Sequence, residues 1–184
     1  GNGVRNDIGG IYTLGVSPGT VLYHNLINVI TRFERGSQGD GGWGIYLDEG
    51  SSHVLVENNV VHHTKCASYN QHFGRENTVR NNVFAFGGEG GVSLGSAEEH
   101  VSFTFTRNVV LVDGQPPYMQ GYAGALRSRP ILADRNCFWD ESGALASDES
   151  AAGARKARES WESVVTSAEW NELGNDTHSL RVDP

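Results

Sequence analysis

The chain is poor in basic residues, proline and cysteine, and it has no long apolar run. Of its 184 residues, 14 are Lys or Arg and 22 are Asp or Glu, which gives a formal net charge of −8 at pH 7. Nucleic acids and anionic membranes need a basic face, so we expect neither as a partner. No stretch approaches the roughly 18 apolar residues of a membrane-spanning helix.

Cysteine and proline are scarce, whereas glycine is not. The two cysteines, Cys66 and Cys137, fall about three repeats apart in the pattern described below, too far for a disulfide, so we expect two buried free thiols. There are 5 prolines but 24 glycines. Because the glycines accompany regular β-branched runs, they indicate tight turns rather than disorder. The length fits one domain.

A short phrase recurs five times along the chain. Each copy has a polar residue, then Asn, then two mostly apolar residues. The copies are 24–27, 58–61, 81–84, 107–110 and 135–138, and their Asn residues are 34, 23, 26 and 28 positions apart. A repeat of this length is typical of a solenoid, a propeller or another array.

Short β-branched or aromatic segments bounded by Gly, Ser or Asn accompany each copy. One set begins mostly with Gly or Ala (10–15, 44–50, 67–72 and 91–95), and a second set leads into the phrase (21–23, 54–56, 77–79, 103–105 and 131–133). Two or three short strands per repeat predict an all-β right-handed parallel β-helix of about five coils. The recurring Asn then forms a ladder at a turn, where it bonds its stacked neighbours and tolerates the left-handed conformation.

The repeat divides the chain into two parts. Residues 1–140 are predicted to form the β-helix, and residues 141–184 a helical or irregular segment that packs on it, with a short helix around Trp161–Trp170. Longer connections at 32–43 and 113–122 are interpreted as loops beside a binding face. Solenoids need terminal caps, and because none is obvious here we expect a part of a longer protein.

Aligning the first set of strands predicts one cluster of polar residues. The alignment stacks three tyrosines in one column: Tyr12, Tyr46 and Tyr69. It brings four polar residues together where two neighbouring coils meet: Asp48, Glu49, Gln71 and His72. A solvated outer face is the alternative interpretation. Because strand residues alternate between faces, only one of Asp48 and Glu49 can face the site.

Two further acids, Asp7 and Asp40, precede Gly-rich turns into these strands. An Asx turn would explain either residue. Glycoside hydrolysis also needs a pair of carboxylates, beside aromatic rings that stack on sugars, such as Trp43, Tyr12 and Tyr46. One acid protonates the leaving oxygen, and the other activates water or attacks directly. The sequence has no phosphate-binding loop, nucleophile elbow or zinc motif.

Residues 42–52, 56–61, 71–77 and 170–180 resemble parallel β-helix carbohydrate-active enzymes of the pectate-lyase-like superfamily, closest to glycoside hydrolase family 141. The resemblance implies a polysaccharide or oligosaccharide substrate, an extracellular or periplasmic bacterial protein, and Asp48 and Asp7 as the catalytic pair. The chain departs from the family at Ile8, where Gly commonly follows the acid, and lacks a long N-terminal part. The expected substrate-binding residues are Asp40, Trp43, Tyr46, Glu49, Gln71, His72 and Arg75.

Two other functions remain open on the same scaffold. A polysaccharide lyase removes a proton next to a uronate, usually with a Lys or Arg base and often with Ca²⁺. Near the proposed face the sequence offers Lys65, Arg75 and Arg80. A non-catalytic module would bind carbohydrate without turnover. No cofactor or metal ligand is predicted, Ca²⁺ remaining open, and the oligomeric state is undetermined.

Overall fold

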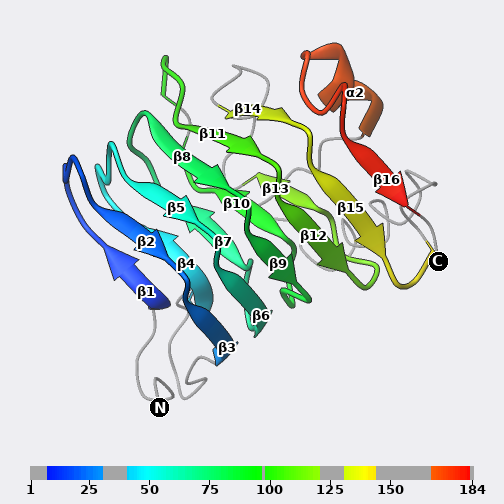
Figure 1. The fold of residues 1–184 in the computed structure, drawn as a ribbon, viewed down its shortest axis with the longest axis horizontal. Helices are drawn as coiled ribbons and strands as arrows, with labels where there is room; N and C mark the ends of the chain where they lie inside the picture. Colours follow the sequence, from blue (N-terminus) through cyan, green and yellow to red (C-terminus); the bar gives the residue numbers. More distant parts are fainter. Residues whose placement is uncertain (1–7, 31–40, 97, 121–130, 144–166, 183–184) are drawn as a thin grey trace.

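The structure, a computed structural model, describes residues 8–30, 41–96, 98–120, 131–143 and 167–182. In these ranges the chain is nearly all β, with one short helix, α2 (Ser167–Glu172). The strands form three sheets, and every pairing between them is parallel (Figure 1). The predicted nearly all-β class is confirmed, and the arrangement is consistent with a parallel β-helix.

Successive strands visit the three sheets in turn. The first sheet contains β1 (Gly9–Thr13), β4 (Trp43–Leu47), β7 (Tyr69–Gln71), β10 (Val92–Leu94) and β13 (Tyr118–Gln120). The second contains β2 (Val21–Tyr23), β5 (Leu55–Glu57), β8 (Asn77–Arg80), β11 (Phe103–Thr106) and β14 (Ile131–Asp134). The third contains β3 (Leu26–Ile30), β6 (Val60–Thr64), β9 (Val83–Ala85), β12 (Val109–Val112), β15 (Cys137–Asp140) and β16 (Leu180–Val182).

The third sheet shows what the apolar pair of the recurring phrase does. Each pair begins a strand of this sheet immediately after its Asn. The sequence predicted two kinds of strand, and this third kind completes each turn of the chain. The predicted loop at 113–122 is partly wrong, because β13 lies within it and joins the edge of the first sheet beside β10. Tyr118 of β13 is buried in the core, which explains why this segment is ordered as a strand.

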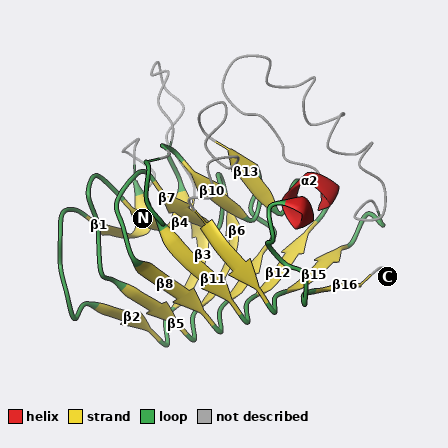
Figure 2. Ribbon diagram, turned by 90° about the horizontal axis from the view of Figure 1, so that it is seen from above, coloured by secondary structure: helices red, strands yellow, loops and turns green. Residues whose placement is uncertain are grey.

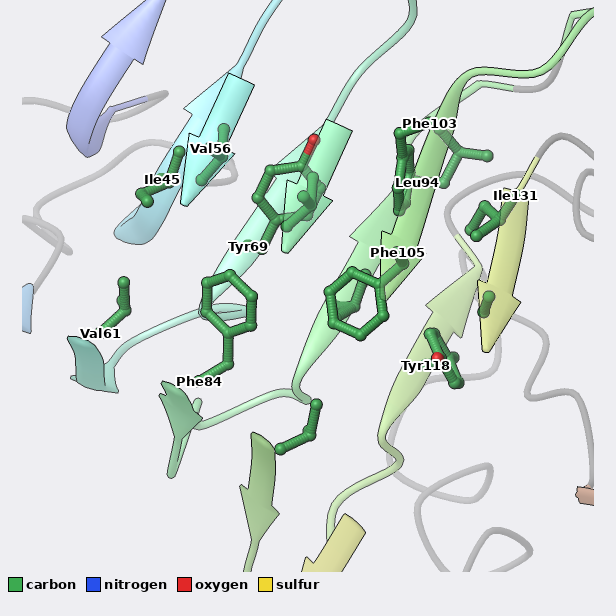
Figure 3. Packing of buried hydrophobic residues seen from close by; sticks show 14 of the residues in the cluster. Ile45, Val56, Val61, Tyr69, Phe84, Leu94, Phe103, Phe105, Tyr118 and Ile131 are labelled. Atoms are coloured by element: carbon green, nitrogen blue, oxygen red, sulfur yellow. The ribbon is translucent and has the colours of Figure 1, made fainter. Parts of the chain in front are cut away.

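The core consists of apolar side chains stacked in columns, and each of the three sheets contributes to it (Figure 3). Equivalent positions hold Ile45, Tyr69, Val92 and Tyr118 in the first sheet, Val56, Val79, Phe105 and Ala133 in the second, and Val61, Phe84, Val110 and Phe138 in the third. These side chains are almost completely buried. Burying one such side chain contributes roughly 1.5–3 kcal/mol, so the stacked columns hold the sheets together.

The predicted Asn ladder is present and runs through the five copies of the phrase: Asn25, Asn59, Asn82, Asn108 and Asn136. Each backbone N–H donates to the side-chain oxygen of the next Asn at 2.9 or 3.0 Å. The side-chain nitrogen donates to the same oxygen at 2.9–3.3 Å. The ladder therefore satisfies buried amides at every turn, and its role is structural.

The left-handed residue at each turn is not the ladder Asn, which corrects one detail of the prediction. Positive φ values of 54–56° belong to the residue before it: His24, Asn58, Asn81, Arg107 and Arg135. That residue turns the backbone so that the following Asn points inward. The five copies of the phrase share a polar side chain at this position, but not one residue type.

Asp176 ends the ladder at the C-terminal side of the stack. Its Oδ1 accepts hydrogen bonds from Asn136 Nδ2 (2.8 Å) and Ser179 Oγ (2.6 Å). Its Oδ2 accepts from Trp170 Nε1 and Tyr118 Oη, both at 2.7 Å. Trp170 belongs to α2, which lies at the end of the stack that carries β13, β15 and β16 (Figure 2). The C-terminal segment thus contributes the helix and also a strand, β16, that the sequence did not predict.

The remaining expectations about the chain concern thiols and membranes. Neither cysteine forms a disulfide. Cys66 is buried, as expected, whereas Cys137 is half-buried because it alternates along β15 with the buried Phe138 and faces away from the core. Within the described ranges, no helix has the length and the apolar character needed to cross a membrane.

Candidate active site

Asp48 lies immediately after β4, at the carboxyl end of the first sheet. The register pairs Tyr12 of β1 with Tyr46 of β4. Because side chains alternate along a strand, Asp48 lies on the same face as Tyr46, two positions before it. Parallel strands bring their carboxyl ends to one edge of a sheet, so residues after β1, β4 and β7 meet there.

The carboxylate of Asp48 is buried and well supplied with hydrogen-bond donors. Its residue is 5% exposed. The Tyr12 hydroxyl donates to Oδ2. The Tyr46 hydroxyl donates to Oδ1 at 2.8 Å, and His72 Nδ1 lies 3.0 Å from the same oxygen. Four residues from three neighbouring strands and their ends therefore form one connected polar group.

These contacts decide the charge of Asp48. Burial alone raises its pKa, because it penalises the charged form. The hydrogen bonds that the carboxylate accepts outweigh burial, and the pKa is lowered from its usual value. The larger contributions come from Tyr12 and Tyr46, followed by the backbone N–H of Glu49 and by His72. Asp48 is therefore ionised at neutral pH.

The observed register differs by one residue from the predicted alignment of the third coil. Tyr69 pairs with Ile45, and Asn70 pairs with Tyr46. The predicted alignment was wrong because it matched Tyr69 to Tyr46 by residue type. Tyr69 belongs to the core, and a shift of one residue moves every side chain of a strand to the opposite face. The correct register puts His72, not Gln71, beside Asp48.

His72 is the accessible member of the group. Its side chain is 31% exposed, against 8% for that of Asp48. Its ring contacts the ring of Phe73 edge-on, with centroids 5.0 Å apart. In the next coil the equivalent position is Gly95, and a Cβ there would lie 3.0 Å from His72 Cδ2. Glycine at this position therefore leaves room for the imidazole.

Aromatic rings extend from Asp48 along β1 and β4. Tyr12 and Tyr46 contact each other edge-on at 5.2 Å, and Trp43 and Tyr46 are 4.5 Å apart. Tyr12 is 45% exposed and Trp43 is half-buried, whereas Tyr46 is buried. The sequence suggested these rings for stacking on sugars, but it did not reveal the hydrogen bonds from the Tyr12 and Tyr46 hydroxyls to Asp48. The spacing of Tyr46 and Asp48, two residues apart on a strand, was the available signal.

Gln71 lies in the interior, not with the polar group. Its residue has no exposed surface. Its side-chain oxygen accepts hydrogen bonds from Tyr69 Oη (3.1 Å) and Asn77 Nδ2 (3.0 Å), and its nitrogen donates to the carbonyls of Gly74 and Ser102. The hydrogen bonds of the side-chain amide are satisfied within the protein and connect β7 to the following turns, so Gln71 does not reach a substrate.

The other predicted site residues lie around this group or outside the residues that the structure describes. Glu49 and Arg75 are exposed in turns that follow β4 and β7. The Arg75 N–H donates to Ser52 Oγ at 3.0 Å, which fixes its backbone and leaves the side chain at the surface. Asp7 and Asp40 lie outside the described residues.

A second His–Asp pair lies on the second sheet. His178 Nδ1 is 3.0 Å from Asp134 Oδ2, the same distance as in the pair of His72 with Asp48, but the side chain of His178 is 71% exposed. It borders an open cleft of about 360 Å³ with Thr104, Thr106 and Leu132. In the described part of the chain, no group of three or more His, Cys, Asp or Glu side chains could hold a metal ion.

No protein-family model, no curated protein and no solved structure matches the chain.

Proposed function

We propose that the chain is a glycoside hydrolase that acts on polysaccharide or oligosaccharide, with Asp48 and Asp7 as its carboxylate pair. The observation that supports this most is the burial of an ionised Asp48 among hydroxyl and imidazole groups at the end of a strand. Packing does not require a charge there, because Leu14 occupies the equivalent position one coil earlier. Burying a carboxylate costs free energy unless it is paired, and such sites are commonly functional.

The two acids have different roles in this proposal. A lowered pKa keeps Asp48 ionised, which suits the base side of the pair. Asp7 then protonates the glycosidic oxygen as the bond breaks. Tyr12 and Trp43, with their accessible ring surfaces, are proposed to contact sugar rings, and Glu49, Asp40 and Arg75 their hydroxyl groups. Gln71 has no accessible surface and is not included.

The proposal includes the finer architecture and the cellular setting. We propose that residues 1–140 wind as a right-handed parallel β-helix of about five coils, on which residues 141–184 pack. Three parallel sheets visited in turn support a helix of this kind, and parallel crossovers are right-handed in about 98% of cases. An extracellular or periplasmic location in a bacterium follows from the resemblance to β-helix carbohydrate-active enzymes.

Release of reducing sugar across a panel of neutral and acidic glycans tests the activity. We expect wild-type protein to release sugar from at least one glycan and Asp48→Asn to release at least about 100-fold less, the usual contribution of a general acid or base. Asp134→Asn, which removes the carboxylate of the second His–Asp pair, is the matched control and should keep most of the activity. Unchanged turnover by a folded Asp48→Asn variant contradicts the proposal.

A polysaccharide lyase is the second candidate, and one observation favours it. The accessible titratable side chains at Asp48 are His72 and Tyr12, and a lyase needs a base beside the uronate and a proton donor for the leaving oxygen. Unsaturated products from a uronate polymer, with no release from neutral glycans, would identify this chemistry. Binding of glycans without turnover of any of them would identify a non-catalytic module.

A further inference from the structure

We propose that His72 is the residue that exchanges a proton with the reacting molecule, and that Asp48 is the positioning residue behind it. The proposal rests on the glycoside hydrolase function and deepens it. Asp48 keeps its place on the base side of the pair but acts through the imidazole rather than directly.

Access distinguishes the two side chains. Each oxygen of the Asp48 carboxylate already accepts a hydrogen bond from a tyrosine, and Oδ1 also faces His72. With 8% of its side chain exposed, Asp48 offers little surface to a water molecule or a sugar. The imidazole beside it is 31% exposed and can be reached from solvent.

The contact with Asp48 determines which ring nitrogen of His72 carries the proton. An ionised carboxylate only accepts hydrogen bonds, so Nδ1 at 3.0 Å from Oδ1 must be the donor. In the neutral ring, Nε2 then carries the lone pair. Nε2 has no hydrogen-bond partner among the described residues, so it is available to accept a proton.

Two neighbours fix the orientation of the ring. Phe73 packs edge-on against it, and Gly95 lies against Cδ2 from the next coil. A side chain at position 95 would crowd the imidazole and force His72 to shift, because its Cβ would approach Cδ2 and the His72 backbone to 3.0 and 3.2 Å. The orientation that the reaction needs is therefore present before substrate binds.

The proton balance is simple. Water attacks the anomeric carbon, forming the new carbon–oxygen bond, and gives its proton to His72 Nε2. The glycosidic carbon–oxygen bond breaks, and its oxygen takes the proton of Asp7, the acid of the proposed function. The imidazolium formed at His72 is stabilised by the Asp48 carboxylate. Exchange with solvent returns both groups to their starting states.

Nitrogen-15 NMR of the histidine rings tests the pair without any need for substrate. In protein labelled at its 7 histidines, signals absent from His72→Asn identify His72. We expect neutral His72 to be the tautomer protonated at Nδ1, and Asp48→Asn to weaken that preference. Asp134→Asn, which changes the matched pair with His178, should leave the His72 signals unchanged. A neutral His72 protonated at Nε2, or signals unaffected by Asp48→Asn, overturns the proposal.

Kinetics on the glycan that wild-type protein hydrolyses tests the role of His72. His72→Asn and Asp48→Asn should each lower kcat by about 10²–10⁴-fold with little change in KM, and the double variant should lose no more than the worse single variant. His178→Asn is the control and should keep wild-type kcat. Full kcat in folded His72→Asn overturns the proposal. Wild-type protein that hydrolyses no glycan contradicts the proposed function and the role of His72 in it, while the tautomer still decides whether the pair exists.

Discussion

Asp48 is a carboxylate whose solvation shell has been replaced by side chains. Two tyrosine hydroxyls and an imidazole take the place of water around it. These donors are present before any substrate arrives, so the protein has already compensated for burial of the charge. The same donors make the charge state of Asp48 part of the stability of the fold.

The stability of the fold should therefore depend on pH through Asp48. Its pKa in the folded protein is lowered relative to the unfolded value near 3.9. Its contribution is fully present above the unfolded pKa and is lost as the pH falls through the folded value. We expect the difference in free energy of unfolding between wild type and Asp48→Asn to be largest above about pH 5 and to shrink toward pH 2. Urea unfolding at several pH values measures it, and a difference that does not vary with pH would contradict the assignment.

At the scale of the strand and turn, the Asn ladder connects neighbouring coils. Asn82 and Asn108 are almost completely buried, and each accepts two hydrogen bonds from the preceding Asn. The residues before them point outward, so neighbouring positions in the sequence have opposite environments.

Substitution at these neighbouring positions should have opposite effects. Asn108→Ala leaves two donors of Asn82 without an acceptor, and we expect a loss of about 2–4 kcal/mol in the free energy of unfolding. Arg107 is exposed with φ at 56°, so Arg107→Gly should be neutral or stabilising by up to about 1 kcal/mol. Chemical denaturation of both variants measures this contrast. Equal destabilisation by the two changes would mean that the ladder amides are not the important contacts.

The repeat could be predicted from the sequence because equivalent positions of each copy carry similar residue types. The Asn positions and the β-branched runs led to the ladder and to parallel strands. The alignment of the first set of strands brought His72 to Asp48, although it also placed Gln71 there. The alignment of the third coil failed for a physical reason. Tyr69 and Tyr46 are the same residue type, but Tyr69 belongs to the hydrophobic core, whereas Tyr46 lies on the opposite face of the sheet with Asp48. The segment 67–72 begins with Ala where the other segments of its set begin with Gly, and residue type alone does not show which face of the strand a side chain occupies.

Other features depend on contacts between distant segments and could not be found from local patterns. Strand β13 exists because Tyr118 fills the core beside Phe105 and reaches Asp176, 58 positions along the chain. Hydrogen bonding of Tyr12 to Asp48 likewise depends on the register of β1 with β4. Such contacts are set by the length of each coil, which the recurring phrase only approximates.

At the scale of the whole molecule, Asp176 anchors the C-terminal segment to the stacked strands by hydrogen bonds. Four donors converge on its carboxylate, from the turn before β15, from β13, from α2 and from the turn before β16. Burial and the coulombic effect of Asp176 also raise the pKa of the Tyr118 hydroxyl, so that this group remains a donor.

Removal of this carboxylate should destabilise the whole molecule. We expect Asp176→Ala to lower the free energy of unfolding by about 3 kcal/mol or more, because buried donors lose their acceptor. Asp134→Ala removes a more exposed carboxylate nearby and should cost less than about 1 kcal/mol. Thermal and urea unfolding of the two variants provide the comparison. A loss below about 1 kcal/mol for Asp176→Ala would show that the segment is held by packing alone.

The Asn ladder has a direction, so the dipoles of its side-chain amides are aligned along the stack of strands. From Asn25 to Asn136, each side-chain carbonyl that accepts from a ladder Asn faces the preceding coil, and each amide nitrogen donates to the Asn of the following coil. The amide nitrogens of the three middle residues also donate to backbone carbonyls of the preceding coil. The bond dipoles therefore add along the stack and polarise one another, as peptide dipoles do in a helix. Their positive end meets the anionic Asp176. A charge placed at this end is stabilised mainly by the nearest rungs, so the C-terminal segment is coupled to the ladder electrostatically as well as by contact.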